Sequence, residues 1–508
     1  MILVGIADNA HDSNISAWIN GKFRYAKYER ESGIKHGRAP AIWFWKKLES
    51  WGIEEKDIDA FAYVEPHTYY DSEHGYMSHD PAPFYGEAFL TKYNVTNGWN
   101  GMCKHLPDDH YFLLDHHYAH FFSNTTMTSG DKAVISDTGG SNNHKTLIIG
   151  TDSEEFVRPN RDVASSGRLL YKLGQKMGLH GEESDVIGKI MGLQAFGKID
   201  EYLVREWTNR GRSDAGHLYQ YIDNLKIDPS PDNPYWLEKV ASVFEIGRNY
   251  QKEMFDVLGP QDSKIYYSGG IALNVNWNRY IKDSGYDVVI EPHVYDGGLS
   301  IGCVRFLAEQ FGQQIEIDNF PYIQDDESPS QQPKDSLIKE VAEMLAEGKI
   351  VGWYQGQGEL GPRALGNRSI LMNPTIENGK DILNQKVKRR EWWRPFGASV
   401  KQDKASEYVD MDYSPYMLYT SNVLDDRLTN VTHVDGTCRH QTVNENQNNL
   451  YYRLLDEFEK LTGLPVLLNT SLNIGGRPIA GKIDDAVELL RRSDMDALCA
   501  GDDLYTKG

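Results

Sequence analysis

"MILVGIADN" (residues 1–9) and "KAVISDTGG" (residues 132–140) decide the fold of this chain. In each stretch an apolar run ends at an aspartate, Asp8 or Asp137, and a second apolar run follows after a polar turn. Apolar runs bounded by turn residues predict strands. Because the same strand–acid–turn–strand unit begins two halves, we expect a duplicated α/β fold. The alternative is chance similarity between two ordinary hairpins.

The segments that follow fit this plan. Residues 236–259 have the apolar periodicity of a long amphipathic helix, and residues 264–281 predict a strand whose Gly269 and Gly270 open a second helix. Glycines at such a turn let a phosphate or ribose approach the backbone. Duplication of this kind is typical of the actin-like ATPase superfamily (ASKHA), in which the paired hairpins face each other across a nucleotide cleft.

Length and composition indicate more than one domain. The chain has 508 residues, and single cores stop growing at ~250 to 300 residues. Acid, proline and glutamine crowd "FPYIQDDESPSQQPKDS" (residues 320–336), and a predicted helix and buried strand follow it. We therefore expect a first domain at residues 1–322, a linker at 323–336 and a second, α/β domain at 337–508.

We expect a cytoplasmic protein without a membrane span. The first residues carry no basic leader, and no run reaches ~18 apolar residues. The four cysteines lack the spacing of a metal finger or a disulfide framework, which fits a reducing compartment. A net charge of -21 argues against broad nucleic-acid binding, although a narrow basic groove stays open. The sequence also leaves open whether the protein forms a homodimer.

Cations gather locally despite the acidic background. "GELGPRALGNRSILMNP" (residues 358–374) and "KVKRREWWRPF" (residues 386–396) together contain Arg363, Arg368, Lys386, Lys388, Arg389, Arg390 and Arg394. Such a group would attract a compact anion such as a phosphate. The alternative is a solvated charged helix face.

The usual nucleotide motifs are missing. "GGSNNHKT" (residues 139–146) approaches the P-loop pattern, but His144 replaces its second glycine and the segment predicts a hairpin. No G-x-G-x-x-G fingerprint follows a predicted strand. We therefore reject a P-loop NTPase.

The strongest metal candidate is "LLDHHYAHFF" (residues 113–122). His116 and His120 are four residues apart, so on a helix their imidazoles lie on one face. If Asp137 and Asp296 converge on them, the mixed N/O set would suit Fe(II), Mn(II) or Zn(II). An incidental histidine pair and two capping aspartates are the alternative.

From its first residue to its last few, the chain resembles the NodU/CmcH-type O-carbamoyltransferases. Members of this family join a domain similar to the universal tRNA threonylcarbamoyl transferase ATPase to a YrdC-like domain. The matching stretches, in family order, include "GIADNAHDSNISAWINGK", "YERESGIKHGRAP", "DHHYAH", "SDTGGSN", "SGGIALN", "YDGGLSIGC", "GPRALGNRSILMNP", "VKRREWWRPFGASV", "THVDGTCRHQTV" and "LPVLLNTSLNIGGRPI".

The resemblance implies a two-step reaction. The YrdC-like domain would make carbamoyladenylate from carbamoyl phosphate and ATP, with Mg²⁺ accompanying the ATP, and release pyrophosphate. The first domain would then move the carbamoyl group to a hydroxyl, using Fe(II) or another divalent metal.

The resemblance also assigns residues. The phosphate-bearing substrates would be held by Arg363, Lys388, Arg394, Arg439 and Ser471, of which Lys388 and Arg394 would also serve catalysis. The metal would be bound by His116, His120, Asp137 and Asp296. The adenylate would be cradled by Gly269, Gly270 and Asn274. The acceptor alcohol would lose its proton with help from His11, Asp12, Lys35 and His36.

Two features leave questions open. Gly358 and Leu360 stand where many members carry bulkier apolar residues, which puts the packing beneath Arg363 in doubt. Residues 65–89 contain aromatic side chains that could stack on a base or a sugar, or could pack onto their own domain: Tyr69, Tyr70, Tyr76, Phe84 and Tyr85.

Three classes of function remain. The first is an O-carbamoyltransferase acting on a small-molecule or sugar hydroxyl or on a 5-hydroxymethylated pyrimidine in DNA. The second is a tRNA threonylcarbamoyladenosine-type enzyme, although that pathway normally divides the two folds between separate proteins. The third is a non-catalytic actin-like binding module, which would need neither the cationic group nor a metal set.

Overall fold

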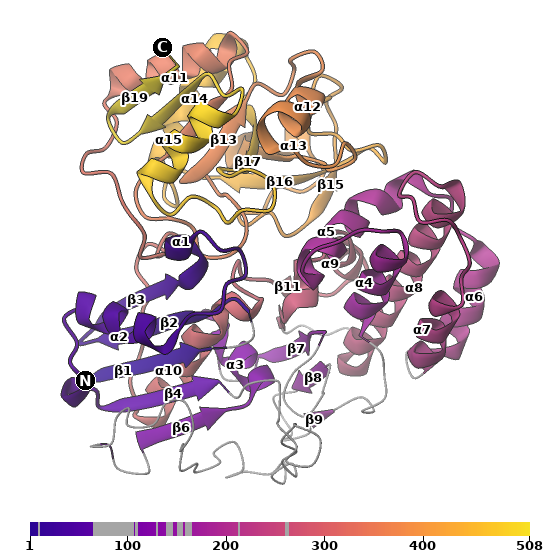
Figure 1. The fold of residues 1–508 in the computed structure, drawn as a ribbon, viewed down its shortest axis with the longest axis horizontal. Coiled ribbons are helices and arrows are strands. Elements are labelled where there is room, and N and C mark those ends of the chain that lie inside the picture. The colour runs from indigo at the N-terminus through magenta and orange to yellow at the C-terminus, as the bar shows by residue number, and fades with distance from the viewer. Residues whose placement is uncertain are drawn as a thin grey trace.

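The computed structural model describes most of the chain, and the predicted aromatic insertion lies outside the described residues. These are residues 1–8, 11–64, 106, 110–128, 131–138, 146–149, 156–157, 165–211, 214–259 and 264–507. Figure 1 shows two smaller sheets below, a group of helices at the right and a larger sheet above. Among the described residues, no helix combines the length and the apolar character needed to cross a bilayer.

The first sheet has five strands. Its order is β3 (Lys22–Lys27), β2 (Asn14–Ile19), β1 (Ile2–Ala7), β4 (Ala60–Val64) and β6 (Tyr111–Leu114). β1 pairs antiparallel with β2 in the predicted hairpin and parallel with β4. The hairpin places Ala7, just before Asp8, opposite Asn14.

The second sheet repeats this arrangement. Its order is β9 (Phe156–Val157), β8 (Thr146–Ile149), β7 (Lys132–Ser136), β10 (Ile265–Ser268) and β11 (Val288–Val289). β7 pairs antiparallel with β8 and parallel with β10, as β1 does with β2 and β4. The two sheets therefore share strand order and pairing direction.

Helices cover these sheets and extend to one side. Against the first sheet lie α1 (Tyr28–Ser32), α2 (Ala41–Ser50), α3 (His116–Ser123) and α10 (Leu299–Gln310). The group at the right of Figure 1 comprises α4 (Ser166–Lys176), α5 (Glu183–Leu193), α6 (Glu201–Arg210), α7 (Ala215–Asp223), α8 (Pro234–Leu258) and α9 (Val275–Asp283). Trp236 and Trp277 are buried in the core of that group. The helices predicted near residues 236 and 275 are confirmed as α8 and α9.

Helix α10 packs closely on its neighbours because glycines, which have no Cβ, occupy the contact positions. A Cβ at Gly302 would overlap the carbonyl oxygen of Ala119 on α3, and one at Gly5 of β1 would overlap the carbonyl oxygen of Ser300. Ser300 also donates its backbone N–H to Asn14 Oδ1 at 3.0 Å. These contacts fix α10, α3 and β1 relative to one another.

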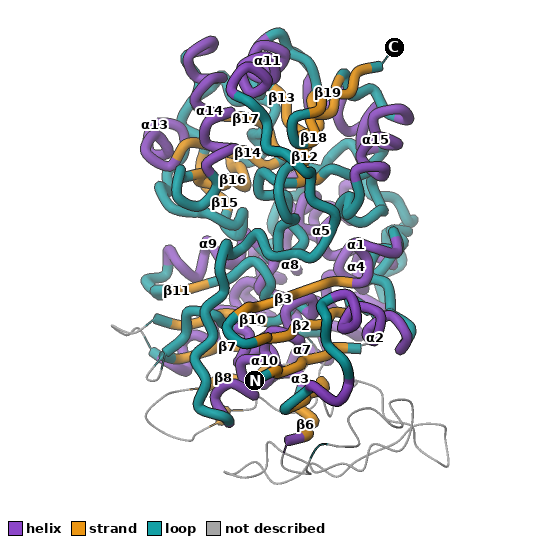
Figure 2. Tube along the Cα trace, turned by 90° about the vertical axis from the view of Figure 1, so that its left-hand side faces the viewer, coloured by secondary structure: helices purple, strands orange, loops and turns teal. Residues whose placement is uncertain are grey.

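The third sheet has eight strands. Its order is β15 (Thr420–Asn422), β16 (Thr437–Val443), β14 (Gly397–Lys401), β17 (Val466–Ser471), β13 (Arg368–Met372), β12 (Val351–Tyr354), β18 (Ala497–Ala500) and β19 (Asp503–Thr506). The helices of this region are α11 (Asp335–Ala346), α12 (Gly379–Ile382), α13 (Ala405–Tyr408), α14 (Asn449–Thr462) and α15 (Ile483–Arg492). The predicted helix and strand after the acidic segment are confirmed as α11 and β12. Figure 2 shows this region stacked on the first two sheets.

The acidic segment before α11 lies in the junction between these regions. Gln324 is buried and bridges Tyr25 of β3 and Gly358. Asp326 accepts a hydrogen bond from the fully buried Arg368 at 2.8 Å. The composition therefore predicted that this segment lacks helices and strands, but it did not predict the burial of Gln324 and Asp326. The domain boundaries stay a prediction.

We expect Gly302→Ala to lower the stability of the first domain by about 3 kcal/mol, because the new Cβ must displace backbone. Gly188→Ala in α5 is the matched control, since a Cβ there would meet nothing within 4 Å. Thermal unfolding of both variants checks this expectation. A Gly302→Ala protein as stable as the parent would contradict the close packing of α10 on α3.

Candidate active site

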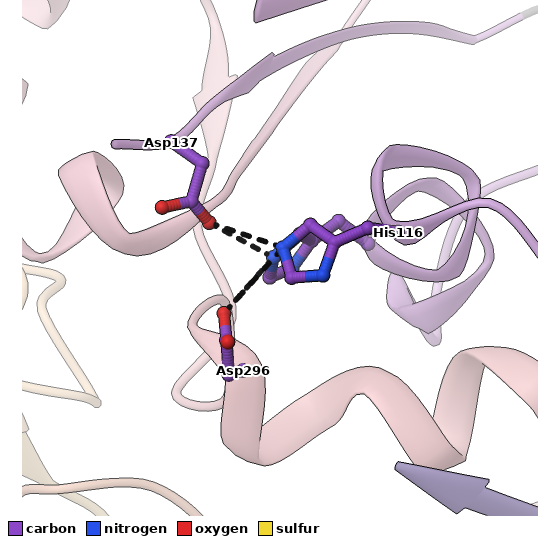
Figure 3. Close-up of side chains that lie close together, drawn as sticks. His116, Asp137 and Asp296 are labelled. Carbon is purple, nitrogen blue, oxygen red and sulfur yellow. Dashed lines mark hydrogen bonds and ion pairs between the residues drawn. The ribbon is translucent and has the colours of Figure 1, made fainter. Parts of the chain in front are cut away.

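The four predicted metal ligands converge. His116 and His120 lie on α3, Asp137 directly follows β7, and Asp296 begins the short 3-10 helix Asp296–Gly298 that leads into α10. One ligand atom from each of the four residues lies within 4.8 Å of all the others, and all four residues are buried. Figure 3 shows the carboxylates of Asp137 and Asp296 directed toward the imidazole of His116.

Distances within the group are short. His120 Nε2 lies 3.1 Å from Asp137 Oδ2 and 3.5 Å from Asp296 Oδ1. His116 Nε2 lies 3.5 Å from the same Asp137 oxygen and 3.6 Å from the same Asp296 oxygen. Two nitrogens and two carboxylate oxygens facing one point fit a divalent transition metal.

The local sequence explains this geometry. Asp115 caps α3 by accepting the backbone N–H groups of His117 and Tyr118, so His116 starts the helix and His120 follows one turn later. Burial alone would lower the pKa of His120, but hydrogen bonds with Asp137 and Asp296 raise it to about 9. Asp8, the counterpart of Asp137 in the first hairpin, instead contacts Arg38 at 3.3 Å.

Gly269 and Gly270, which were predicted to cradle the adenylate, lie beside Asp137. Gly269 has a φ of 93°, and a Cβ there would overlap the carbonyl oxygen of Ser136. The Gly270 N–H donates to Asp137 Oδ2 at 3.2 Å. Asn274 caps α9 through its side-chain oxygen, while its buried Nδ2 has no hydrogen-bond partner among the described residues.

The predicted acceptor residues form a second, connected group. Asp12 is buried, and its carboxylate contacts His11 Nδ1 at 2.9 Å and His36 Nδ1 at 2.9 Å. His11 Nδ1 also lies 3.8 Å from Asp296 Oδ2, which connects this group to the metal ligands. Lys35 does not contact Asp12 in the described structure; it forms an ion pair with Asp185 of α5.

The carboxylates around these histidines favour their protonated forms. Burial acts against this, but contacts with Asp12 and Asp296 raise the pKa of His11 to about 10. Contacts with Asp12 and Asp185 likewise raise the pKa of His36 to about 9 against the effect of burial. In this state each imidazole donates hydrogen bonds. The His11 side chain is 45% exposed, so it is the accessible member of the pair.

Sequence reasoning missed Lys27, which balances the charge of this group. Lys27 Nζ lies 2.7 Å from Asp12 Oδ1 and 2.9 Å from Glu29 Oε1, and it donates to the Tyr295 hydroxyl at 2.8 Å. Buried carboxylates need such a partner. A lysine at the end of a strand carries no local signal of this role, because two of its three partners, Asp12 and Tyr295, come from other segments of the chain.

The predicted substrate cations of the second domain also converge. Arg363, Lys388, Arg390, Arg394 and Arg439 form a group that we call the cationic cluster. Burial and the neighbouring Arg394 lower the pKa of Arg363 to about 10. Burial, followed by the effects of the neighbouring arginines, holds the pKa of Arg439 well below its ordinary value. These like charges repel one another and therefore favour a bound anion.

Lys388 is buried against Ser471 and Asn473. Its Nζ donates to the Ser471 carbonyl at 2.6 Å, to the Ser471 hydroxyl at 3.1 Å and to the Asn473 carbonyl at 2.8 Å. Burial, with Arg390 and Arg394 nearby, keeps the pKa of Lys388 well below its ordinary value. None of the oxygens named here belongs to a carboxylate.

Three cations of the two basic motifs lie elsewhere. Arg368 is fully buried against Asp326 and over the ring of Tyr354, so its role is structural. Lys386 is exposed and lies 3.8 Å from Asp494. Arg389 is exposed and donates to the Arg492 carbonyl.

The cationic cluster faces the first domain. Lys35 contributes to lowering the pKa of Lys388, and Asp185 partly offsets the lowering of the pKa of Arg394 by burial. Lys189 of α5 lies 2.9 Å from Glu391, and Arg394 of the cluster lies 3.7 Å from the same residue. The cationic cluster therefore borders α5.

Comparison with known proteins adds the family context. A family model described as the carbamoyltransferase C-terminus matches residues 342–507. The nodulation protein NolNO of Sinorhizobium fredii is 28% identical over 94% of this chain and 76% of its own length. Nodulation protein NolO of Bradyrhizobium diazoefficiens is 33% identical, and the alignment covers 63% of this chain and 65% of NolO.

A third relative is named as an enzyme. The 3'-hydroxymethylcephem-O-carbamoyltransferase of Amycolatopsis lactamdurans is 30% identical over 63% of this chain and 65% of its own length. This chain thus spans just under two thirds of the length of that relative and of NolO.

We expect the purified protein, after treatment with a chelator, to bind one equivalent of Fe(II), Mn(II) or Zn(II) in calorimetric titrations. Asp296→Asn removes one charged ligand and should weaken this binding by at least about tenfold. Asp232→Asn, at an exposed position, is the control. Equal metal affinity in the Asp296→Asn protein and the parent would contradict the ligand assignment.

Proposed function

We propose that this chain is a carbamoyltransferase of the NodU/CmcH-type O-carbamoyltransferase family and that it works in two steps. Its second domain makes carbamoyladenylate from carbamoyl phosphate and ATP. Its first domain transfers the carbamoyl group from the adenylate to an acceptor hydroxyl, which loses its proton, and AMP is the leaving group. The observation that carries this proposal is the presence in one chain of a buried His/Asp quartet and of a cationic cluster that borders α5 of the first domain.

We also infer the finer fold assignment. The shared strand order of the two five-stranded sheets supports a duplicated actin-like (ASKHA) first domain. The match to the carbamoyltransferase C-terminus supports a separate second domain, to which we assign the YrdC-like type that the family resemblance implies. The cytoplasm is the compartment that supplies ATP and carbamoyl phosphate together, and we propose that the enzyme works there.

The cationic cluster suits the first step. Carbamoyl phosphate and ATP are both anions, so their reacting atoms meet only if nearby cations offset the repulsion. Arg363, Arg394 and Arg439 would bind phosphate oxygens, and Lys388 would order the Ser471 end of β17 beside them. Atom balance requires inorganic phosphate to leave as well as pyrophosphate: water releases carbamate from carbamoyl phosphate, and a carbamate oxygen then attacks the α-phosphorus of ATP.

The quartet of the first domain suits the second step. His116, His120, Asp137 and Asp296 would hold Fe(II) or another divalent metal, which as a Lewis acid would polarise the carbamoyl carbonyl. Gly269, Gly270 and Asn274 would bind the AMP portion beside Asp137. His11 is the exposed group next to Asp296. We propose that its imidazole, oriented by Asp12, contacts the acceptor hydroxyl.

The acceptor is a hydroxyl group on another molecule. The named cephem relative supports a hydroxymethyl group on a small molecule. A sugar hydroxyl presents the same alcohol chemistry, and so does a 5-hydroxymethylated pyrimidine in DNA.

Arg363→Ala and Lys388→Ala should each reduce pyrophosphate release that depends on carbamoyl phosphate by at least about hundredfold, because the anions lose a preorganised cation or the order around it. His120→Ala should leave this release within about twofold of the parent enzyme and abolish transfer. The control is Lys386→Ala, which alters an exposed cation of the same motif. Equal loss of both steps in His120→Ala would overturn the division of labour.

Mass spectrometry should identify the acceptor. The protein is incubated with ATP, carbamoyl phosphate and separate pools of hydroxymethyl compounds, glycosides and hydroxymethylated DNA. We expect one carbamoyl group to be added in at least one pool; a hydroxymethylated DNA product would identify a nucleic-acid acceptor. Product formation that requires threonine and bicarbonate in place of carbamoyl phosphate would contradict the proposal.

A further inference from the structure

We propose that Arg30 of the first domain is a positioning residue for the loop at residues 358–368, which carries Arg363 and which we call the donor loop. Docking of the first domain would thereby set the place of Arg363 in the cationic cluster. The inference rests on the proposed function only where it treats Arg363 as a donor-binding residue.

Arg30 reaches the donor loop from α1. It is 3% exposed, and its Nη2 donates to the carbonyl oxygens of Glu359 at 3.3 Å and Gly361 at 3.2 Å. Its Nε and Nη1 have no hydrogen-bond partner among the described residues. One guanidinium nitrogen thus binds the two carbonyls on either side of Leu360.

The Leu360 side chain is held by the first domain and the acidic segment. It is fully buried in a cluster with Tyr25, Ile301 and Ile323. Its N–H donates to the Pro321 carbonyl at 2.8 Å. Because of these contacts, Leu360 packs into the junction. It is one of the two positions at which the sequence departs from the expected family pattern.

Gly361 is shaped by the same surface. Its φ of 102° favours glycine, and a Cβ there would overlap the carbonyl oxygen of Pro292. Glycine is needed at Gly358, the other such position, for a similar reason. A Cβ added there would overlap the carboxylate of Asp326. These close contacts leave the first half of the donor loop no room for a different backbone path.

Glu359 connects this half to the second half. Its buried Oε1 accepts the backbone N–H groups of Leu365 at 2.8 Å, Asn367 at 2.7 Å and Arg368 at 2.9 Å. A carboxylate that accepts several backbone donors holds them in a fixed arrangement. Because Arg30 binds the carbonyl of the same residue, it acts on both halves of the loop.

Arg363 lies between these two anchored halves. Within the described part of the chain, its side chain makes no hydrogen bond, and its Nε is buried without a partner. The direction of the guanidinium is therefore set by the loop backbone. Loss of the Arg30 contacts would release that backbone without touching the cationic cluster directly.

The test compares Arg30→Met with Arg24→Met, a control that removes an exposed arginine from the neighbouring strand. Hydrogen–deuterium exchange is followed in peptides that cover residues 359–372 and, as an internal reference, residues 466–471 of β17. Pyrophosphate release is measured over a range of carbamoyl phosphate concentrations.

In Arg30→Met we expect faster exchange in the donor loop, unchanged exchange in β17, and a KM for carbamoyl phosphate raised about tenfold while kcat stays within about threefold. Arg30→Lys should restore part of the difference, because an ammonium group can still donate to one of the carbonyls. Arg24→Met should match the parent protein in every measurement.

Exchange at the parental rate in the donor loop, or an equal increase in β17, would overturn the proposal. If Arg30→Met does not fold, the same comparison is decided with Arg30→Lys: a change confined to the donor loop supports positioning, and any other pattern refutes it. If the parent protein releases no pyrophosphate, the proposed function fails, whereas the exchange measurement still decides the role of Arg30.

Discussion

Close packing of α10 against α3 and β1 is the constraint on which the first domain depends. Gly302 and Gly5 allow backbone to approach backbone, and this contact brings the start of α10 to the imidazoles of α3. Asp296 precedes α10 and therefore arrives beside His116 and His120. Four side chains from three distant segments meet because their elements cannot be moved apart without losing that contact.

Local patterns were enough to predict several elements and to single out residues that lie together in the structure. Spacing identified His116 and His120 as a pair, and strand ends identified Asp137, because both signals depend on neighbouring residues. The topology makes Asp8 the counterpart of Asp137, but Asp8 contacts Arg38 and lies outside the group formed by His116, His120, Asp137 and Asp296. Equivalent topology therefore does not fix the partner of a side chain.

Pairing over long distances could not be predicted in this way. Arg368 was grouped with the substrate cations because of its neighbours in sequence, whereas its carboxylate partner, Asp326, lies in the acidic segment. Lys27 carried no signal because Asp12 and Tyr295, two of its three partners, come from other segments of the chain. A buried charge is explained only by the partner that compensates it, and that partner is a property of the tertiary structure.

Helix α1 presents Glu29 to Lys27 and Arg30 to the donor loop from adjacent positions. The two domains are therefore not interchangeable modules, although the chain between them contains no helix or strand at residues 325–334. Replacing either α1 or the donor loop of this chain alone would therefore leave Arg30 or the carbonyls of Glu359 and Gly361 without their present partners.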